Sequence, residues 1–141
     1  LKQYVFLLVL KKKKIQLNQY GDYSLCEDLV SKKYLNWQLN KRDKVDLIEK
    51  NYNQKIEVEC TPLNNILEMV DAPNIIDFFS LDVEGSEKRV LEGINFSKYK
   101  FKFLLIEITF NQNDIINFLK KKKYILIKNI TPWDYLFKIE E

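Results

Sequence analysis

The chain has 141 residues, a length that suits one domain, and 46% of them are hydrophobic, enough to fill a core and to exclude a disordered chain. Its 23 basic and 20 acidic residues leave a net charge of only +3, which gives no electrostatic case for a nucleic-acid partner. The sequence has no histidine, which excludes Ser-His-Asp and Cys-His machinery, histidine-ligated zinc and a histidine base. Any catalysis must therefore use carboxylates, lysines, tyrosines or a bound metal.

Cysteine usage and apolar runs bear on where the protein resides. Cys26 and Cys60 belong to no CxxC pair, so we expect reduced packing thiols, as in a cytoplasmic protein. The apolar run over residues 4–10 is much shorter than the ~20 residues of a transmembrane helix and has no signal-peptide cleavage site. Because the chain starts at Leu1 without methionine and passes almost directly into this run, we interpret it as a truncated product or a gene fragment.

Two strands and a helix are expected in the first third of the chain. The continuous apolar run at 4–10 is typical of a strand covered on both faces. Residues 15–20 alternate between apolar and polar side chains, which predicts a half-exposed strand. Ser24, with Glu27 three residues later, forms a capping box that predicts the start of a helix. The polar stretch that follows predicts only a short helix, over residues 45–50.

From residue 55 onward, strand and helix signals alternate. Short apolar or alternating runs predict strands at residues 55–60, 75–81, 101–107, 124–128 and 135–139. Helices are expected after Thr61, Ser86 and Asn111, because these residue types cap helix N-termini. Pro62 suits the first helical position, and Gly93 is expected to end the second helix. This order predicts an α/β, three-layer fold whose mostly parallel sheet ends in an antiparallel hairpin, as one domain over residues 1–141.

Acidic side chains follow two of the predicted strands. Asp82 and Glu84 come directly after one strand, and Glu107 ends the next. Ligands of parallel sheets bind beyond the carboxyl ends of the strands, so three carboxylates would meet at one rim if the strands are neighbours. Grouped carboxylates are unfavourable unless they are paired or hold a cation, which makes this rim a candidate site. The alternative is that these acids are solvated strand ends or partners of a helix dipole, as we expect for Glu87.

The segment from Ile76 to Glu87 reads Ile-Asp-Phe-Phe-Ser-Leu-Asp-Val-Glu-Gly-Ser-Glu and is followed by Val90, Leu91 and Gly93. It resembles the signature strand and helix of FkbM-family, S-adenosylmethionine-dependent methyltransferases. Similar flanking segments lie at residues 58–67, 104–107, 124–128 and 134–137. The resemblance runs from about residue 55 to the end, so residues 55–141 are interpreted as the signature core and residues 1–54 as a variable strand and helix region.

The resemblance implies an incomplete Rossmann-like, class I methyltransferase fold, of which this chain would be the C-terminal portion. The family's first strand carries an acidic Gly-rich loop for the cofactor, and its second strand carries an acid for the ribose. The sequence has only Gly21, Gly85 and Gly93, and none lies in a G-x-G context. We therefore expect the chain alone to bind S-adenosylmethionine with a dissociation constant no better than about 1 mM and to be inactive by itself.

The implied activity is transfer of a methyl group to a hydroxyl of a sugar or small metabolite. Asp82 and Glu84 would be catalytic, Asp82 would also contact the cofactor, and Glu107 would be a further catalytic or substrate contact. A hydroxyl needs a base that accepts its proton as the methyl group arrives, or a divalent metal that lowers its pKa. Trp133 and Tyr135 would line the acceptor pocket, with core packing as the alternative.

Other interpretations stay open at this level. The chain could be a non-catalytic methyltransferase-like remnant that acts as an interaction module. Asp82 at a strand end could be a phosphoacceptor, but the strand at 4–10 lacks the acids which that reading needs. The lysine runs 11–14 and 120–123 are interpreted as a solvated turn and a helix end, with phosphate or an anionic membrane as the alternative partner. We expect a small-molecule or glycan acceptor, no nucleic acid and no membrane. We also expect self-association through an exposed sheet edge beside the strand at residues 4–10 and the strand that contains Phe78.

Overall fold

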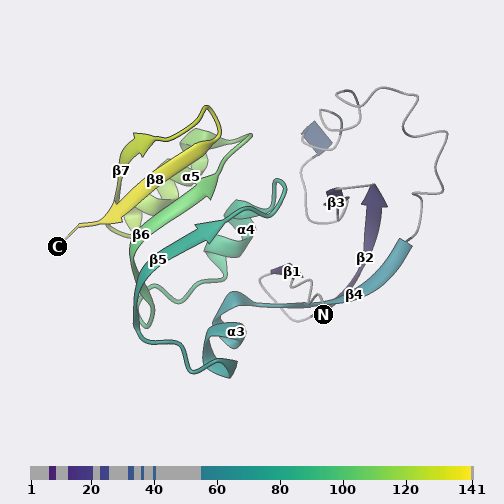
Figure 1. Ribbon diagram of the computed structural model, residues 1–141, viewed down its shortest axis with the longest axis horizontal. Coiled ribbons are helices and arrows are strands. Elements are labelled where there is room, and N and C mark those ends of the chain that lie inside the picture. Colours follow the sequence, from purple (N-terminus) through teal and green to yellow (C-terminus); the bar gives the residue numbers. More distant parts are fainter. Residues whose placement is uncertain are drawn as a thin grey trace.

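The computed structural model describes residues 7–8, 13–20, 23–25, 32–33, 36, 40 and 55–140, which contain two four-stranded sheets (Figure 1). The first sheet has the strand order β1-β4-β2-β3. Its strands are β1 (Leu7–Leu8), β2 (Lys13–Tyr20), β3 (Tyr23–Leu25) and β4 (Lys55–Thr61). β1 runs parallel to β4, whereas β2 pairs antiparallel with both β3 and β4.

The second sheet contains the remaining strands in the order β5-β6-β8-β7. They are β5 (Ile75–Leu81), β6 (Lys100–Glu107), β7 (Tyr124–Asn129) and β8 (Asp134–Ile139). β5 and β6 are parallel, and β8 pairs antiparallel with β6 and β7, so the predicted C-terminal hairpin is confirmed. Each described sheet has one parallel and two antiparallel pairings, so the sheets are mixed and the expectation of a mostly parallel sheet was wrong for these strands.

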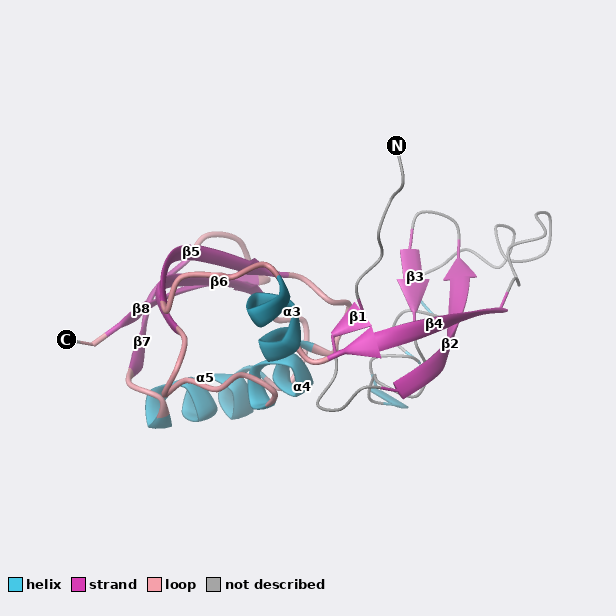
Figure 2. Cartoon of the chain, turned by 90° about the horizontal axis from the view of Figure 1, so that it is seen from below, coloured by secondary structure: helices cyan, strands magenta, loops and turns pink. Residues whose placement is uncertain are grey.

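In the described range 55–140, three helices accompany the second sheet: α3 (Leu63–Met69), α4 (Glu87–Glu92) and α5 (Gln112–Lys121). α4 and α5 lie on the same face of this sheet (Figure 2). Side chains from that face and from the helices form one core, because alternate strand residues turn inward and the apolar helix positions meet them. Its fully buried members include Leu91, Phe101, Leu104, Ile106, Ile115, Leu119, Tyr124 and Phe137.

The opposite face of the second sheet is partly apolar. Phe78, Phe103, Lys138 and Ile125 are aligned across the four strands by the pairing register. Phe78 is 54% exposed, Phe103 37% and Ile125 44%. Within the described part of the chain no helix covers this face, and β5 is an outer strand of the sheet (Figures 1 and 2). Self-association through this edge stays a prediction.

Several predicted helix starts differ from the observed ones. Ser24 lies within β3, where it cannot cap a helix, and its predicted partner Glu27 lies outside the described residues, as does the expected helix at 45–50. Thr61 is the last residue of β4, because the β4 ladder extends through it, and Pro62 takes the N-cap position of α3. The helices that follow Ser86 and Asn111 do begin where predicted, although neither side chain makes a capping hydrogen bond.

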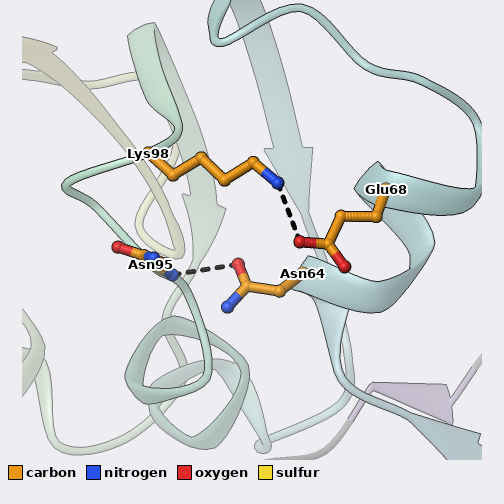
Figure 3. Close-up of polar contacts among 4 residues, drawn as sticks. All are labelled: Asn64, Glu68, Asn95 and Lys98. Atoms are coloured by element: carbon orange, nitrogen blue, oxygen red, sulfur yellow. Dashed lines mark hydrogen bonds and ion pairs between the residues drawn. The ribbon is translucent and has the colours of Figure 1, made fainter.

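Two polar contacts join α3 to the segment that leads into β6 (Figure 3). The backbone N–H of Asn95 donates to Oδ1 of Asn64 at 2.9 Å, and Lys98 Nζ lies 2.8 Å from Oε1 of Glu68. All four polar groups come from residues at the amino-terminal end of the β5–β6 pair or from the helix beside it. They orient α3 without contributing to the acidic rim described next. No described helix is long and apolar enough to cross a bilayer.

Candidate active site

The pairing register brings the predicted acids to one edge of the second sheet. Leu81 pairs with Ile106 in the parallel β5–β6 ladder, so Asp82 and Glu107, the next residues, both lie at the carboxyl ends of these strands. The hypothesis that these acids share an edge is therefore confirmed. The antiparallel β6–β8 ladder pairs Glu107 directly with Asp134. Asp134 thus joins the rim from the start of β8.

The loop after β5 turns sharply. Glu84 has φ 52° and Gly85 has φ 88°, and the N–H of Ser86 donates to the carbonyl oxygen of Val83 at 3.2 Å. Positive φ at both central residues is the pattern of a type I′ turn. Glycine adopts this conformation freely, whereas in Glu84 it costs about 1–2 kcal/mol. Gly85 therefore lets the backbone leave the strand abruptly.

Glu87 occupies the first turn of α4, yet it is not a solvated acid. Its side chain is 4% exposed, and Oε1 accepts the N–H of Gly85 at 2.8 Å and the N–H of Val83 at 3.3 Å. Burial raises the pKa of Glu87, and the backbone donors counteract part of that increase. Glu87 was expected to be solvated or to be a partner of the helix dipole. The expectation of solvation was wrong, because the carboxylate folds back into the turn and is buried there.

Glu107 is the carboxyl with the most altered proton affinity of the rim. Partial burial, followed by the negative charges of Asp82, Glu84, Asp134 and Glu87, raises the pKa of Glu107 to about 7. A like charge nearby disfavours a second ionised carboxylate, and desolvation acts in the same direction. A carboxyl with a pKa near 7 exchanges protons readily at neutral pH, which is the property required of a general acid or base.

Asp134 is held by the loop that precedes β8. The Thr131 hydroxyl donates to Oδ2 of Asp134, and it accepts the backbone N–H of Asp134 at 3.0 Å and of Trp133 at 3.2 Å. The carbonyl oxygen of Trp133 accepts the N–H of Ile108 at 2.7 Å, which attaches this loop to the end of β6. The loop therefore keeps Asp134 beside the carboxyl end of β6.

The two residues expected to line an acceptor pocket differ in exposure. Tyr135 is 8% exposed and belongs to the core, next to Phe137 on the helix-covered face of β8. Trp133 is 44% exposed and directly precedes Asp134. Core packing therefore accounts for Tyr135, whereas Trp133 presents a large aromatic surface on the loop beside the rim.

The rim acids can be compared with the groups they would hold. In the described ranges, no three Asp, Glu or Cys side chains are arranged to hold a metal ion. S-adenosylmethionine carries a sulfonium and an ammonium group, and the hydroxyls of its ribose can donate hydrogen bonds to carboxylates. The surplus of acids around Glu107 fits this cation on charge.

Sequence reasoning missed Asp134 and the burial of Glu87. The signal for Asp134 was present, since a strand that returns antiparallel starts at the edge where its neighbour ends. Nothing in the local sequence distinguishes a buried Glu87 from an exposed acid in the first turn of a helix.

Comparisons with known proteins bear on this arrangement. No curated protein and no solved structure matches the chain. The family model described as the methyltransferase FkbM domain matches residues 8–126, from β1 into β7, and includes the whole turn from Asp82 to Glu87 together with Glu107. The match covers more than half of the sequence and contains the acidic rim except Asp134. The chain therefore belongs to the FkbM methyltransferase domain family.

Proposed function

We propose that this chain carries the acidic rim of an S-adenosylmethionine-dependent O-methyltransferase that acts on a hydroxyl of a sugar or small metabolite. The observation that carries the proposal is Glu107, whose pKa is raised to about 7 at the carboxyl edge of a parallel strand pair. Family membership supplies the methyltransferase class. We further propose that β5 and β6 are the parallel part of a Rossmann-like sheet.

Glu107 would be the general base. An unactivated carboxylate with a pKa near 4 is a weak base for an alcohol, whereas one with a pKa near 7 accepts a proton more favourably. When bound, S-adenosylmethionine supplies an electrophilic methyl group on a positively charged sulfur. Ionised Glu107 would accept the proton of the acceptor hydroxyl as its oxygen takes up the methyl group, and the cofactor would supply that methyl group and leave as a neutral thioether.

Asp82 and Glu84 would support this base in two ways. Their negative charges raise the pKa of Glu107, which increases its affinity for the acceptor's proton. The same charges favour a cationic cofactor at the rim, and Asp82 at the end of β5 would contact it. Asp134, held by Thr131, adds a third charge on the other side of Glu107.

The charge of the rim bears on the acceptor. An anionic acceptor such as a phosphorylated or carboxylated sugar would be repelled by the carboxylates of Asp82, Glu84 and Asp134. A neutral or cationic acceptor is therefore favoured. Trp133 is an exposed aromatic surface on the adjoining loop, where the apolar face of a sugar ring can stack.

Cofactor affinity is a separate expectation. Because none of the three glycines lies in a G-x-G context, the polypeptide of residues 1–141 is expected to bind S-adenosylmethionine with a dissociation constant of about 1 mM or weaker. Isothermal titration calorimetry measures this constant directly. A low-micromolar value would contradict the expectation and would place the cofactor on residues other than a glycine loop.

The decisive experiment is single-turnover methyl transfer to a panel of neutral sugars and alcohols. Because the chain alone is expected to be inactive, it is assayed joined to a segment that supplies the glycine-rich cofactor loop, with S-adenosylmethionine at several times the dissociation constant measured for that protein. Glu107→Gln is expected to lower the rate by about 10²–10⁴-fold, because it removes the base while keeping its shape. Glu68→Gln, which alters an exposed acid paired with Lys98, is the matched control and should retain wild-type rates. Unchanged turnover in Glu107→Gln would overturn the base assignment, and no transfer by the wild-type form of that joined protein would favour a non-catalytic interaction module.

A further inference from the structure

The turn between β5 and α4 has a backbone conformation that needs support. Glu84 and Gly85 both have positive φ, and only Gly85 adopts this region without steric cost. Within the turn, the backbone bond from Ser86 N–H to the Val83 carbonyl measures 3.2 Å, at the long end of the usual range. This bond alone does little to keep Glu84 left-handed.

Glu87 supplies two further contacts to the same turn. Its Oε1 accepts the N–H of Gly85 at 2.8 Å and, more weakly, the N–H of Val83 at 3.3 Å, and these two amides lie on either side of Glu84. Bonds to an ionised acceptor are about twice as strong as neutral ones. A carboxylate is rarely 4% exposed unless such bonds compensate its lost hydration, so the burial of Glu87 and the shape of the turn depend on each other.

This turn determines where two rim charges lie. Asp82 directly precedes the segment that Glu87 contacts, and Glu84 is at its centre. Both carboxylates act electrostatically on Glu107. If Glu84 relaxed to right-handed φ, its Cα–Cβ direction would change and its carboxylate would move relative to Glu107.

We propose that Glu87 is a positioning residue, which clamps the Val83–Ser86 turn and thereby holds Asp82 and Glu84 beside Glu107. The role rests on the proposed function for its catalytic consequence, whereas the clamp itself is a property of the fold. It differs from a helix-dipole role, because a dipole partner requires only a negative charge near the first turn of α4 and no acceptor for the turn amides.

Two substitutions separate the clamp from the charge. Glu87→Gln removes the charge but keeps a side-chain oxygen that accepts the same N–H groups, whereas Glu87→Ala removes both. We expect Glu87→Ala to lower kcat for methyl transfer by about 100-fold and to change the acceptor KM by less than about threefold, because the reacting groups are displaced but still present. Glu87→Gln is expected to recover most of that loss.

A second readout does not depend on catalysis. NMR of protein labelled at backbone nitrogen and at glutamate carboxyl carbons reports the Gly85 amide and the titration of Glu107. In Glu87→Ala, we expect the Gly85 amide resonance to shift and the pKa of Glu107 to fall further than in Glu87→Gln. If the two variants share one Gly85 resonance and one Glu107 titration curve, Glu87 acts by charge alone and the clamp is overturned.

Controls distinguish the remaining outcomes. Glu92→Ala alters an exposed acid of the same helix, paired with Lys88 at 2.8 Å, and is expected to change neither readout. If the wild-type chain transfers no methyl group even when joined to the glycine-rich cofactor loop, the proposed function fails while the NMR comparison still tests the clamp. If Glu87→Ala does not fold by circular dichroism, Glu87→Gln decides: a wild-type Gly85 resonance supports the clamp, and a displaced one overturns it.

Discussion

Carboxylates at the two ends of the β5–β6 pair differ in the charges of their neighbours. Near the amino-terminal end, Asp77 lies 2.6 Å from Nζ of Lys102, and Glu68 of the adjacent α3 lies 2.8 Å from Nζ of Lys98. At the carboxyl end, Glu107 is surrounded by other acids, and none of the described lysines or arginines forms an ion pair with it. Exposed pairs of opposite charge contribute little beyond solubility, whereas grouped acids in a partly desolvated rim change one another's proton affinity. The position of an acid on the sheet, more than its residue type, thus decides whether its proton affinity is altered.

The largest expected effect that tests this contrast comes from Asp82→Asn. Removing this charge takes away a cofactor contact and weakens Glu107 as a base, so transfer should fall by at least about 100-fold with the fold intact. The residual rate should still rise with pH, because ionised Glu107 is the active form. The rising limb of its pH–rate profile should lie at lower pH than the wild-type limb, which is near pH 7, because Asp82 raises the pKa of Glu107.

Asp77→Asn provides the matched control for that prediction. It makes the same chemical change on the same strand, at an exposed residue paired with Lys102. A pH–rate profile from pH 5 to 9 for both variants measures the comparison. Equal loss of activity in Asp77→Asn and Asp82→Asn, or an unmoved limb in Asp82→Asn, would show that the rim has no special role.

A smaller effect is expected from the turn glycine. Gly85 has φ 88°, so Gly85→Ala should lower the free energy of unfolding by about 1–2 kcal/mol and displace the rim charges. Gly93 ends α4 with φ −81° and ψ −5°, a conformation that alanine adopts freely. Gly93→Ala should therefore be neutral or slightly stabilising in urea denaturation. Similar destabilisation by both substitutions would mean that the left-handed turn is not the cause.

The pH dependence of stability offers a further test. The pKa of Glu107 is 4.5 as the reference value and about 7 in the folded chain, so the folded state binds more protons between these pH values. The stability contributed by this group is fully present below pH 4.5 and is lost as pH rises through about 7. Glu107→Gln removes this loss, so its stability relative to wild type should increase from pH 5 to pH 8. Urea denaturation at both pH values measures the difference, and a constant offset would contradict the raised pKa.

The smallest change is expected at the paired end of the sheet. Lys102→Gln leaves Asp77 without this ion-pair partner, but the Asp77 side chain is 84% exposed and water solvates it. The free energy of unfolding should change by no more than about 0.5 kcal/mol, and the pH–rate limb should stay in place. A shift of the limb in Lys102→Gln would show that the two ends of the sheet are electrically coupled.

Much of the second sheet could be predicted from local patterns. The apolar runs that became β5 and β6 have nearly the expected bounds, and the acids after them were identified as candidate site residues before any pairing was known. The helix at Gln112–Lys121 follows from Ile115 and Leu119 on one face, and its final lysines occupy the last turn as expected. Periodicity is a local property, so sequence reveals it directly.

Other features depended on contacts between segments distant in the chain. The antiparallel return of β8, which places Asp134 opposite Glu107, follows from strand order and register. Strand order and register are set by the burial of the apolar side chains of a whole sheet face, which no single segment determines. The mixed pairing of the sheets and the burial of Glu87 arise in the same way. By itself the sequence determined where the acids lie along the chain and, from residue 55 onward, where most strands and helices lie. Only the tertiary structure decided which acids share a desolvated rim, because proton affinity depends on neighbours in space.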